Sequence, residues 1–303
     1  MRSLCAMIAL CLWSCGAAAR AQDFGPSYPP TTLRSGSSYF APGGVFVGIG
    51  GSGTSVTVNN SLYASGNSSV YTNGMLVASG NAGGAANPSN TTQSTFAPVV
   101  QAGFLINSRQ SNWAWGTKFQ YRYLGLTYTQ NGIDSPQANA FTSSGTFDSF
   151  TGRVIVGSSQ TAVNHEFALF PLIGRRFGNG LFYFGGGPVV FETESKIYNA
   201  IGFANVNGAQ VEITGTPANF ASTTWMWGGG AQIGLAYNIT PRWFIDVSYD
   251  AVVTGTYTNN YSSAFSSSST SGGNVYTDSG ALFLSNAQKV YAQSLTVTIN
   301  RSF

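Results

Sequence analysis

The only histidine in the chain, His165, is followed directly by Glu166, and this pair is the first candidate for chemistry. A histidine that is oriented by a carboxylate can act as a general base or activate a nucleophile. In an extended strand, however, neighbouring side chains point to opposite faces, so Glu166 cannot readily orient the ring of His165. The sequence therefore predicts no catalytic residues, and a hydrolase that uses His165 is the least favoured alternative.

Metal, thiol and nucleic-acid chemistry find little support in the residue types. All three cysteines (Cys5, Cys11 and Cys15) lie near the amino terminus, and a single histidine cannot supply a transition-metal cluster. Of the 13 basic residues, Arg2 and Arg20 also lie there, so the remaining ones nearly balance the 10 acidic residues. Without a basic field, nucleic acid is not an expected partner. The sequence predicts no metal and no cofactor.

The first residues have the pattern of an export signal. Arg2 precedes a short apolar run, and small residues end at Ala19-Arg20-Ala21. This order is typical of a secretory signal peptide over residues 1–21. A lipoprotein signal that uses Cys15 is the less favoured alternative, because the bulky Trp13 stands close to it. Residues 22–44 are rich in proline, serine and glycine and are expected to form an extended periplasmic lead-in.

Beyond residue 44, apolar side chains recur at every second position, which is the period of a β-strand. Only 8% of the residues are charged and the mean hydropathy is +0.04, a combination that fits alternating strands facing lipid. Aromatic residues stand at both ends of such strands. Trp113 and Tyr123 are ten residues apart, which corresponds to ~25 Å after a ~40° tilt and matches the apolar band of an outer-membrane barrel. The expected aromatic girdle consists of Trp113, Trp115, Tyr121, Tyr123, Trp225, Trp227, Tyr237, Trp243 and Tyr291.

Charged residues occupy the opposite phase of these strands. Lys118 and Arg122, for example, alternate with Phe119 and Tyr121. An eight-stranded barrel leaves an interior just wide enough for side chains, so such charges must pair with one another. The residues expected to point into the lumen are Lys118, Arg122, Glu166, Glu192, Glu194, Lys196, Asp246 and Asp250. A structural ion-pair network is favoured over a gated path for small solutes.

Long and short connections alternate along the chain. The long ones, expected to be polar extracellular loops, are residues 59–95, 126–163, 198–222 and 258–286. This rhythm predicts an eight-stranded antiparallel up-and-down transmembrane β-barrel over residues 45–303, with long loops outside and tight turns in the periplasm. A ten-stranded barrel, in which residues 147–158 form an arm of a further hairpin, is the second choice.

The last residues carry a resemblance. Leu295, Val297, Ile299 and Phe303 alternate with polar residues and end the chain, and they resemble the signal that the barrel-assembly machinery reads in outer-membrane proteins. The chain as a whole resembles the family of the OmpA transmembrane domain, opacity-type and small porin-like surface proteins. The resemblance implies a Gram-negative outer membrane, with its lipid and lipopolysaccharide as partners.

The long connections suggest the function. They are nearly uncharged and rich in serine, asparagine and glycine with scattered tyrosines, a composition that makes adaptable contacts with glycans or host surfaces. We therefore expect a structural, envelope and adhesion-like role for a surface protein that is not an enzyme. The alternative from another class is a narrow porin for small solutes.

Overall fold

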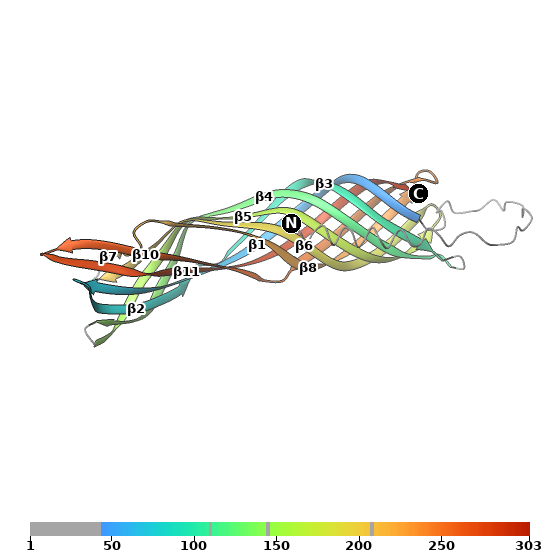
Figure 1. Ribbon diagram of the computed structural model, residues 1–303. Helices are drawn as coiled ribbons and strands as arrows, with labels where there is room; N and C mark the ends of the chain where they lie inside the picture. Colours follow the sequence, from blue (N-terminus) through green and yellow to red (C-terminus); the bar gives the residue numbers. More distant parts are fainter. Residues whose placement is uncertain (1–43, 109–110, 144–145, 207–208) are drawn as a thin grey trace, which may run out of the picture. The chain divides into compact units, whose positions relative to one another are not determined.

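The computed structural model describes residues 44–108, 111–143, 146–206 and 209–303, and regular structure in these ranges consists of β-strands (Figure 1). None of the described residues form a helix that is long and apolar enough to cross a membrane. The expected leader at residues 1–21 and the lead-in lie outside the described residues, except for Gly44. The strands are β1 (Gly44–Thr72), β2 (Met75–Ala85), β3 (Ser89–Asn107), β4 (Trp113–Ser143), β5 (Thr146–Phe177), β6 (Gly180–Val206), β7 (Ala209–Glu212), β8 (Ala218–Asn238), β9 (Trp243–Thr254), β10 (Tyr257–Ser271) and β11 (Asn274–Ser302).

Eight of these strands close into a ring. The antiparallel pairs run β1–β3, β3–β4, β4–β5, β5–β6, β6–β8, β8–β9 and β9–β11, and β11 pairs again with β1. The fold is thus the expected eight-stranded antiparallel up-and-down barrel. The ten-stranded alternative is wrong, because residues 147–158 form the first half of β5 and not the arm of a separate hairpin. A closed ladder pairs the backbone groups around the ring, which a wall in contact with lipid requires.

The ring has one end with short turns. Three tight connections, at 108–112, 178–179 and 239–242, join strands there. The first and last described residues lie at the same end, since the backbone nitrogen of Phe303 donates to the carbonyl of Val45 at 3.0 Å. The first and the last ring strand therefore begin and end, respectively, at the end of the ring that the sequence predicts to be periplasmic.

At the other end, the strands continue where the sequence analysis expected loops. β1 runs on to Thr72, and the long segments are largely paired strands that include β2, β7 and β10. Two glycine-containing turns reverse the chain at Asn73-Gly74 and Gly272-Gly273, where all four residues have positive φ. The expectation of four long loops is thus corrected to extended hairpins. We call these outer parts the β-extension, which comprises residues 60–72, 75–95, 126–143, 146–163, 194–206, 209–224 and 257–288.

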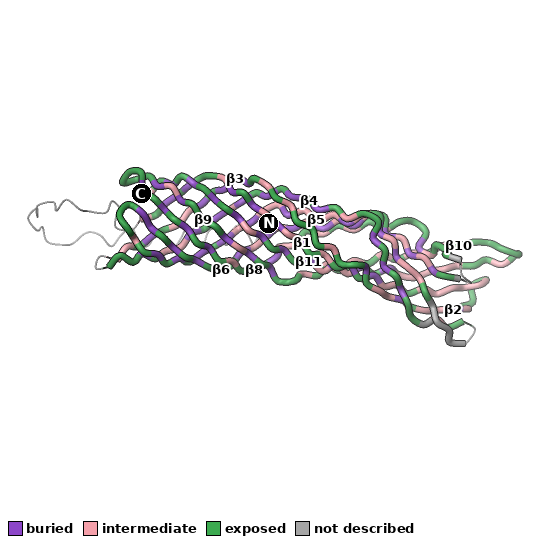
Figure 2. The backbone as a smooth tube through the Cα atoms, turned by 180° about the vertical axis from the view of Figure 1, so that it is seen from behind, coloured by how far each residue is buried: buried purple, intermediate pink, exposed green. Residues whose placement is uncertain are grey.

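Buried and exposed residues alternate along most strands, as the banding in Figure 2 shows. Inside the ring, polar and charged side chains form a layer between two apolar clusters. Inside the β-extension, aliphatic side chains are packed together instead. Its buried cluster consists of Leu62, Ala64, Ala86, Ile133, Val154, Val156, Ile197, Ala200, Leu282 and Leu284. The extension therefore has a hydrophobic core of its own.

Candidate functional site

The half of the polar layer that is nearer the short turns is centred on Asp246 of β9. Its carboxylate accepts hydrogen bonds from Lys118 Nζ at 2.9 Å and from the hydroxyl of Tyr183 at 2.7 Å. The ammonium of Lys118 also donates to the Tyr183 oxygen at 2.5 Å. Lys118 and Asp246 are 1% and 3% exposed. The buried cation is thus held by a carboxylate from the opposite side of the ring and by a phenol from β6, two strands away.

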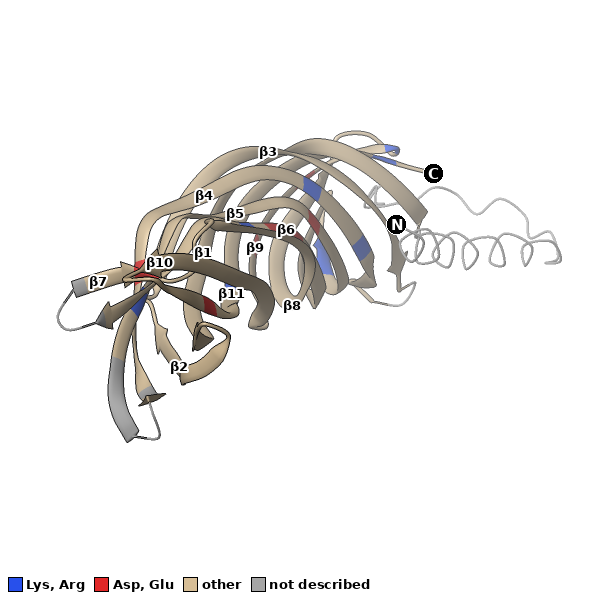
Figure 3. Ribbon diagram, turned by 60° about the vertical axis from the view of Figure 1, so that its left-hand side comes forward, with Lys and Arg blue, Asp and Glu red and all other residues tan. Residues whose placement is uncertain are grey.

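The half that is nearer the β-extension is centred on Arg122 of β4. Its guanidinium binds Asp250 through both Nη atoms, at 2.5 and 2.9 Å, and donates to Glu166 at 2.7 Å. These three side chains are at most 1% exposed. Figure 3 shows that charged residues are sparse along the strands of the ring. Because a lone buried charge is costly, the two carboxylates and the guanidinium stabilise one another only as a group.

Amide side chains join the two halves. Gln120 accepts a hydrogen bond from Gln232 and donates one to Gln101, both at 3.0 Å. Gln101 in turn donates to Asp246 at 3.2 Å. The sequence analysis did not single out Gln101 or Tyr183 as parts of the network. Tyr183 was hidden because β6 is apolar on both faces near it, so only the barrel closure shows which face is inside.

Apolar layers close the lumen on both sides of this network. Towards the short turns, Phe46 and Phe244 meet edge to face, with ring centroids 5.4 Å apart. Towards the β-extension, Phe170, Phe191 and Met226 are fully buried in the cluster above the charges. Apolar side chains thus lie in the lumen on both sides of the polar layer.

The prediction that Glu192 and Glu194 face the lumen is wrong, and Lys196 shares the error. On β6 the odd-numbered side chains Phe191 and Thr193 are the buried ones. Glu192 and Glu194 therefore point outward, with side chains 25% and 35% exposed, and Lys196 binds Glu194 at 2.8 Å on the outer surface. The physical reason is that the strand period fixes alternation but not its phase, and the apolar residues of β6 gave no contrast between the faces.

A row of outward side chains crosses four neighbouring strands at the level of the girdle. The register pairs Tyr123 with His165, His165 with Glu192, and Glu192 with Trp225. His165 thus faces a carboxylate from the next strand, Nε2 to Oε2 at 3.9 Å, while its Nδ1 lies 2.9 Å from the hydroxyl of Tyr121. Glu166 lies on the opposite face, in the lumen. Glu192 is the neighbour of His165 that sequence reasoning missed, because it is 27 positions away along the chain.

The girdle and the carboxy-terminal residues face outward. Trp115, Trp227 and Tyr237 are 54%, 48% and 53% exposed, and Tyr121 and Trp225 are partly exposed. Between the two girdle levels the outward surface is apolar and includes phenylalanines such as Phe119 and Phe184. The remaining residues of the girdle and of the proposed assembly signal are also exposed, and they are Trp113, Tyr123, Trp243, Tyr291, Leu295, Val297, Ile299 and Phe303.

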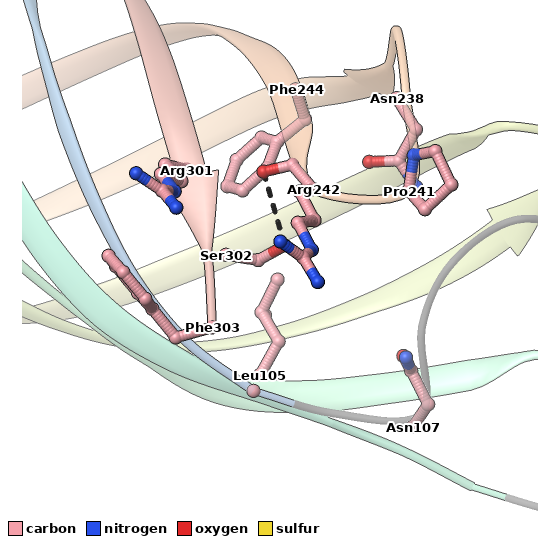
Figure 4. Close-up of a pocket in the computed structure, with 10 residues that line it drawn as sticks. Leu105, Asn107, Asn238, Pro241, Arg242, Phe244, Arg301, Ser302 and Phe303 are labelled. Atoms are coloured by element: carbon pink, nitrogen blue, oxygen red, sulfur yellow. Dashed lines mark hydrogen bonds between the residues drawn. The ribbon is translucent and has the colours of Figure 1, made fainter.

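A hollow of about 550 Å³ opens at the short-turn end of the ring (Figure 4). Leu105 and Phe244 form its apolar side, and Arg242 and Arg301 lie at its rim. The Arg301 guanidinium lies 5.2 Å from the ring centroid of Phe303, which it can hold by a cation–π contact. Phe244, which lines the hollow, also belongs to the apolar cluster with Phe46.

Comparisons with known proteins give no family and only distant structural likenesses. No family model matches the chain, and no curated protein does. Among solved structures, the attachment invasion locus protein Ail of Yersinia pestis is 12% identical, with a TM-score of 0.22, and covers 79% of this chain and 98% of its own. Neisserial surface protein A is 10% identical with a TM-score of 0.28, over 81% of this chain and 97% of its own. The outer membrane protease OmpT from Escherichia coli is 10% identical with a TM-score of 0.32, over 90% and 99%.

The chain has the fold and the lipid-facing surface of an outer-membrane β-barrel. This statement follows from the closed ring and its outward apolar belt, and the low scores of the three likenesses add no activity to it.

Proposed function

We propose that the protein is an outer-membrane surface protein with a structural and adhesion-like role, and that the β-extension makes its contacts outside the cell. The observation that carries this proposal is the extension itself: paired strands continue past the girdle, with a packed core and a nearly uncharged outer surface. A rigid platform binds with a smaller loss of conformational entropy than flexible loops do. The contacts we propose are with host surfaces or glycans.

The far end of the extension supplies a contact patch. The backbone nitrogen of Asn73 donates to the carbonyl of Val275 at 2.8 Å, and its side-chain amide donates to Asn274 at 2.9 Å. These bonds tie the β1–β2 turn to the β10–β11 turn. Around them four apolar side chains are exposed by 38–72%, namely Met75, Leu76, Val275 and Tyr276. Exposed apolar groups gathered on an otherwise polar surface commonly mark an interaction site.

The packed lumen favours this role over the narrow porin. A solute path would have to pass two apolar layers and a network in which Arg122 and Lys118 are held in buried ion pairs. We assign no catalytic step to the protein. Lipid and lipopolysaccharide surround the ring in this proposal, and the alternating carboxy-terminal residues Leu295 to Phe303 stay the proposed signal for the assembly machinery.

The experiment replaces apolar side chains of the contact patch by serine, in positions where the fold should not change. A variant with Met75→Ser, Leu76→Ser and Tyr276→Ser is displayed on cells, and binding to host cells and to immobilised glycans is measured. We expect binding to fall to the level of cells without the protein, while the heat-dependent gel shift of the barrel is unchanged. A matched variant changes three exposed serines of the same extension, Ser262, Ser266 and Ser268, to alanine and should bind normally. Equal binding by the patch variant and the original, or steady single channels from the purified protein, would refute the proposal.

A further inference from the structure

No Lys or Arg of the described chain lies within ion-pair distance of the outward carboxylate of Glu192, in contrast to Asp134 and Glu194. Asp134 is bound by Arg153 at 2.6 Å, and Glu194 is bound by Lys196 at 2.8 Å. Within the described residues, the cation-capable group nearest to Glu192 is His165, whose Nε2 is 3.9 Å from the carboxylate. That distance is too long for a hydrogen bond. The carboxylate of Glu192 can therefore still form a close ion pair with a positively charged group.

The position of Glu192 makes this unusual. It shares a row with Tyr123 and Trp225, and the row below it contains Phe167 and Trp227. Its side chain is 25% exposed and lies at the level of the aromatic girdle, where headgroups meet the hydrocarbon. An unpaired carboxylate at this depth carries a desolvation cost, so acidic residues in such places usually have a partner. A partner supplied by the membrane would meet this requirement.

Two aromatic residues neighbour Glu192 in the register, because Trp225 is its partner on β8 and Phe167 lies two residues from its partner His165 on β5. Phe167 packs against Trp225 with centroids 5.9 Å apart and against Tyr121 at 5.0 Å. Tyr123 stands 5.3 Å from the ring of His165, which completes the surface on the other side. Aromatic faces beside a carboxylate are the arrangement that binds ammonium groups. A divalent cation fits less well, because Mg²⁺ and Ca²⁺ require several oxygen ligands and Glu192 is the one carboxylate in the row.

Two β-bulges in adjacent strands shape this surface. β5 is irregular between Val163 and His165, and β4 is irregular between Tyr123 and Leu126. Gly125 in the second bulge has φ of 60°, and a Cβ there would lie 3.2 Å from the ring of Tyr123. Glycine thus lets the Tyr123 ring lie flat over the backbone. Bulges re-aim side chains near binding sites, and here they direct Tyr123 and His165 towards the same outer surface as Glu192.

We propose that Glu192, with the aromatic groups Phe167 and Trp225 on the neighbouring strands, binds the ammonium group of a membrane lipid headgroup. The carboxylate neutralises the charge and the ring faces hold the ammonium by cation–π attraction. Phosphatidylethanolamine and an amine-bearing glycolipid share this chemistry and are the two sources to be distinguished. The site goes beyond the adhesion role, because it lies on the barrel wall and not on the contact patch at the far end.

The experiment uses the full chain, refolded in mixed micelles that contain equal amounts of phosphatidylethanolamine and phosphatidylglycerol with the same acyl chains. Lipids retained by the protein are counted by native mass spectrometry. We expect a preference for the ethanolamine lipid on the order of tenfold, which Glu192→Gln reduces to none. Glu194→Gln is the matched control, because it removes a carboxylate two positions away that already binds Lys196, and it should keep the preference.

A second arm replaces the ethanolamine lipid by an amine-bearing glycolipid or by its N-acetylated form, which has lost the charge. Retention of the amine form of either lipid, abolished in Glu192→Gln, supports the site and identifies its source. A wild-type protein that retains both lipids equally in both arms overturns the proposal. So does an equal loss in Glu194→Gln and Glu192→Gln. The heat-dependent gel shift checks that each variant is folded, and binding of the contact patch to cells is unaffected by either outcome.

Discussion

The ring and the β-extension are built from the same strands, yet their side chains follow opposite rules. In the ring, the outward side chains are apolar, such as Trp115 and Val247, and the lumen contains Lys118 and Arg122. In the extension, an aliphatic cluster that includes Ile197 is buried together with polar but uncharged side chains such as Thr161 and Gln288, and the outward face is rich in serine, threonine and asparagine. β1 and β11 therefore change their pattern at the girdle without a shift in the register between them, whereas β4 and β5 have bulges there.

This contrast shows that the surroundings, and not the ladder, decide where polar groups go. Lipid outside the ring makes an apolar surface free of cost, so a polar interior is tolerated if every charge is paired. Water outside the extension restores the usual hydrophobic core. The same kind of substitution should therefore change the stability by different amounts in the ring and in the extension.

The largest expected difference concerns ion pairs. Arg122→Met leaves Glu166 and Asp250 buried without a cation and should lower the free energy of unfolding by about 3–5 kcal/mol. Arg153→Met breaks an analogous pair with Asp134 in the extension, where the two side chains are 34% and 44% exposed. It should cost less than about 1 kcal/mol. Urea unfolding in lipid vesicles measures both, and equal losses would contradict the contrast between the regions.

The second-largest difference in stability is expected when a charge is added to the outward face of each region. Val247→Arg places a guanidinium in the middle of the lipid-facing belt and should cost about 2–4 kcal/mol. Ser266→Arg places the same group on the outward face of β10 and should change stability by about 0.5 kcal/mol or less. Refolding yield and urea midpoints of the two purified variants give the comparison. A similar cost at both positions would mean that the extension also faces lipid.

The smallest effect is a pH dependence within the extension. Burial raises the pKa of Asp278 above its usual value, although a hydrogen bond from Ser68 Oγ at 2.5 Å lowers it in part. Because the folded state holds this proton more tightly, stability is highest below the ordinary pKa of about 3.9. It falls as the pH rises from there through the raised value, and then stays level. Asp278→Asn should remove this slope, and Ser68→Ala should make it steeper.

Nuclear magnetic resonance of the extension at a series of pH values can follow the opening of β1 and β11 near these residues. An unchanged slope in Asp278→Asn would assign the pH dependence to another group.

Part of the candidate site could be predicted from the sequence. Strands with a strong contrast between faces, such as Trp113 to Tyr123, show in their residue types which side chains meet lipid and which meet the lumen. Lys118, Arg122, Asp246 and Asp250 lie in such strands, and they lie where the pattern predicted. The hairpin turns also left a signal, because Asn73-Gly74 and Gly272-Gly273 are sequences that favour tight hairpins. We interpreted them as parts of loops, since the surrounding residues are polar on both faces.

The sequence by itself determined the number of ring strands, the lipid-facing belt and the charges that need partners, because a period of two residues is a local property. Only the tertiary structure decided the phase of β6, the length of the strands beyond the girdle, and the row that joins His165 to Glu192 and Trp225. These depend on the register between strands that are distant along the chain. Register is fixed by closure of the whole ring, and no single strand contains that information.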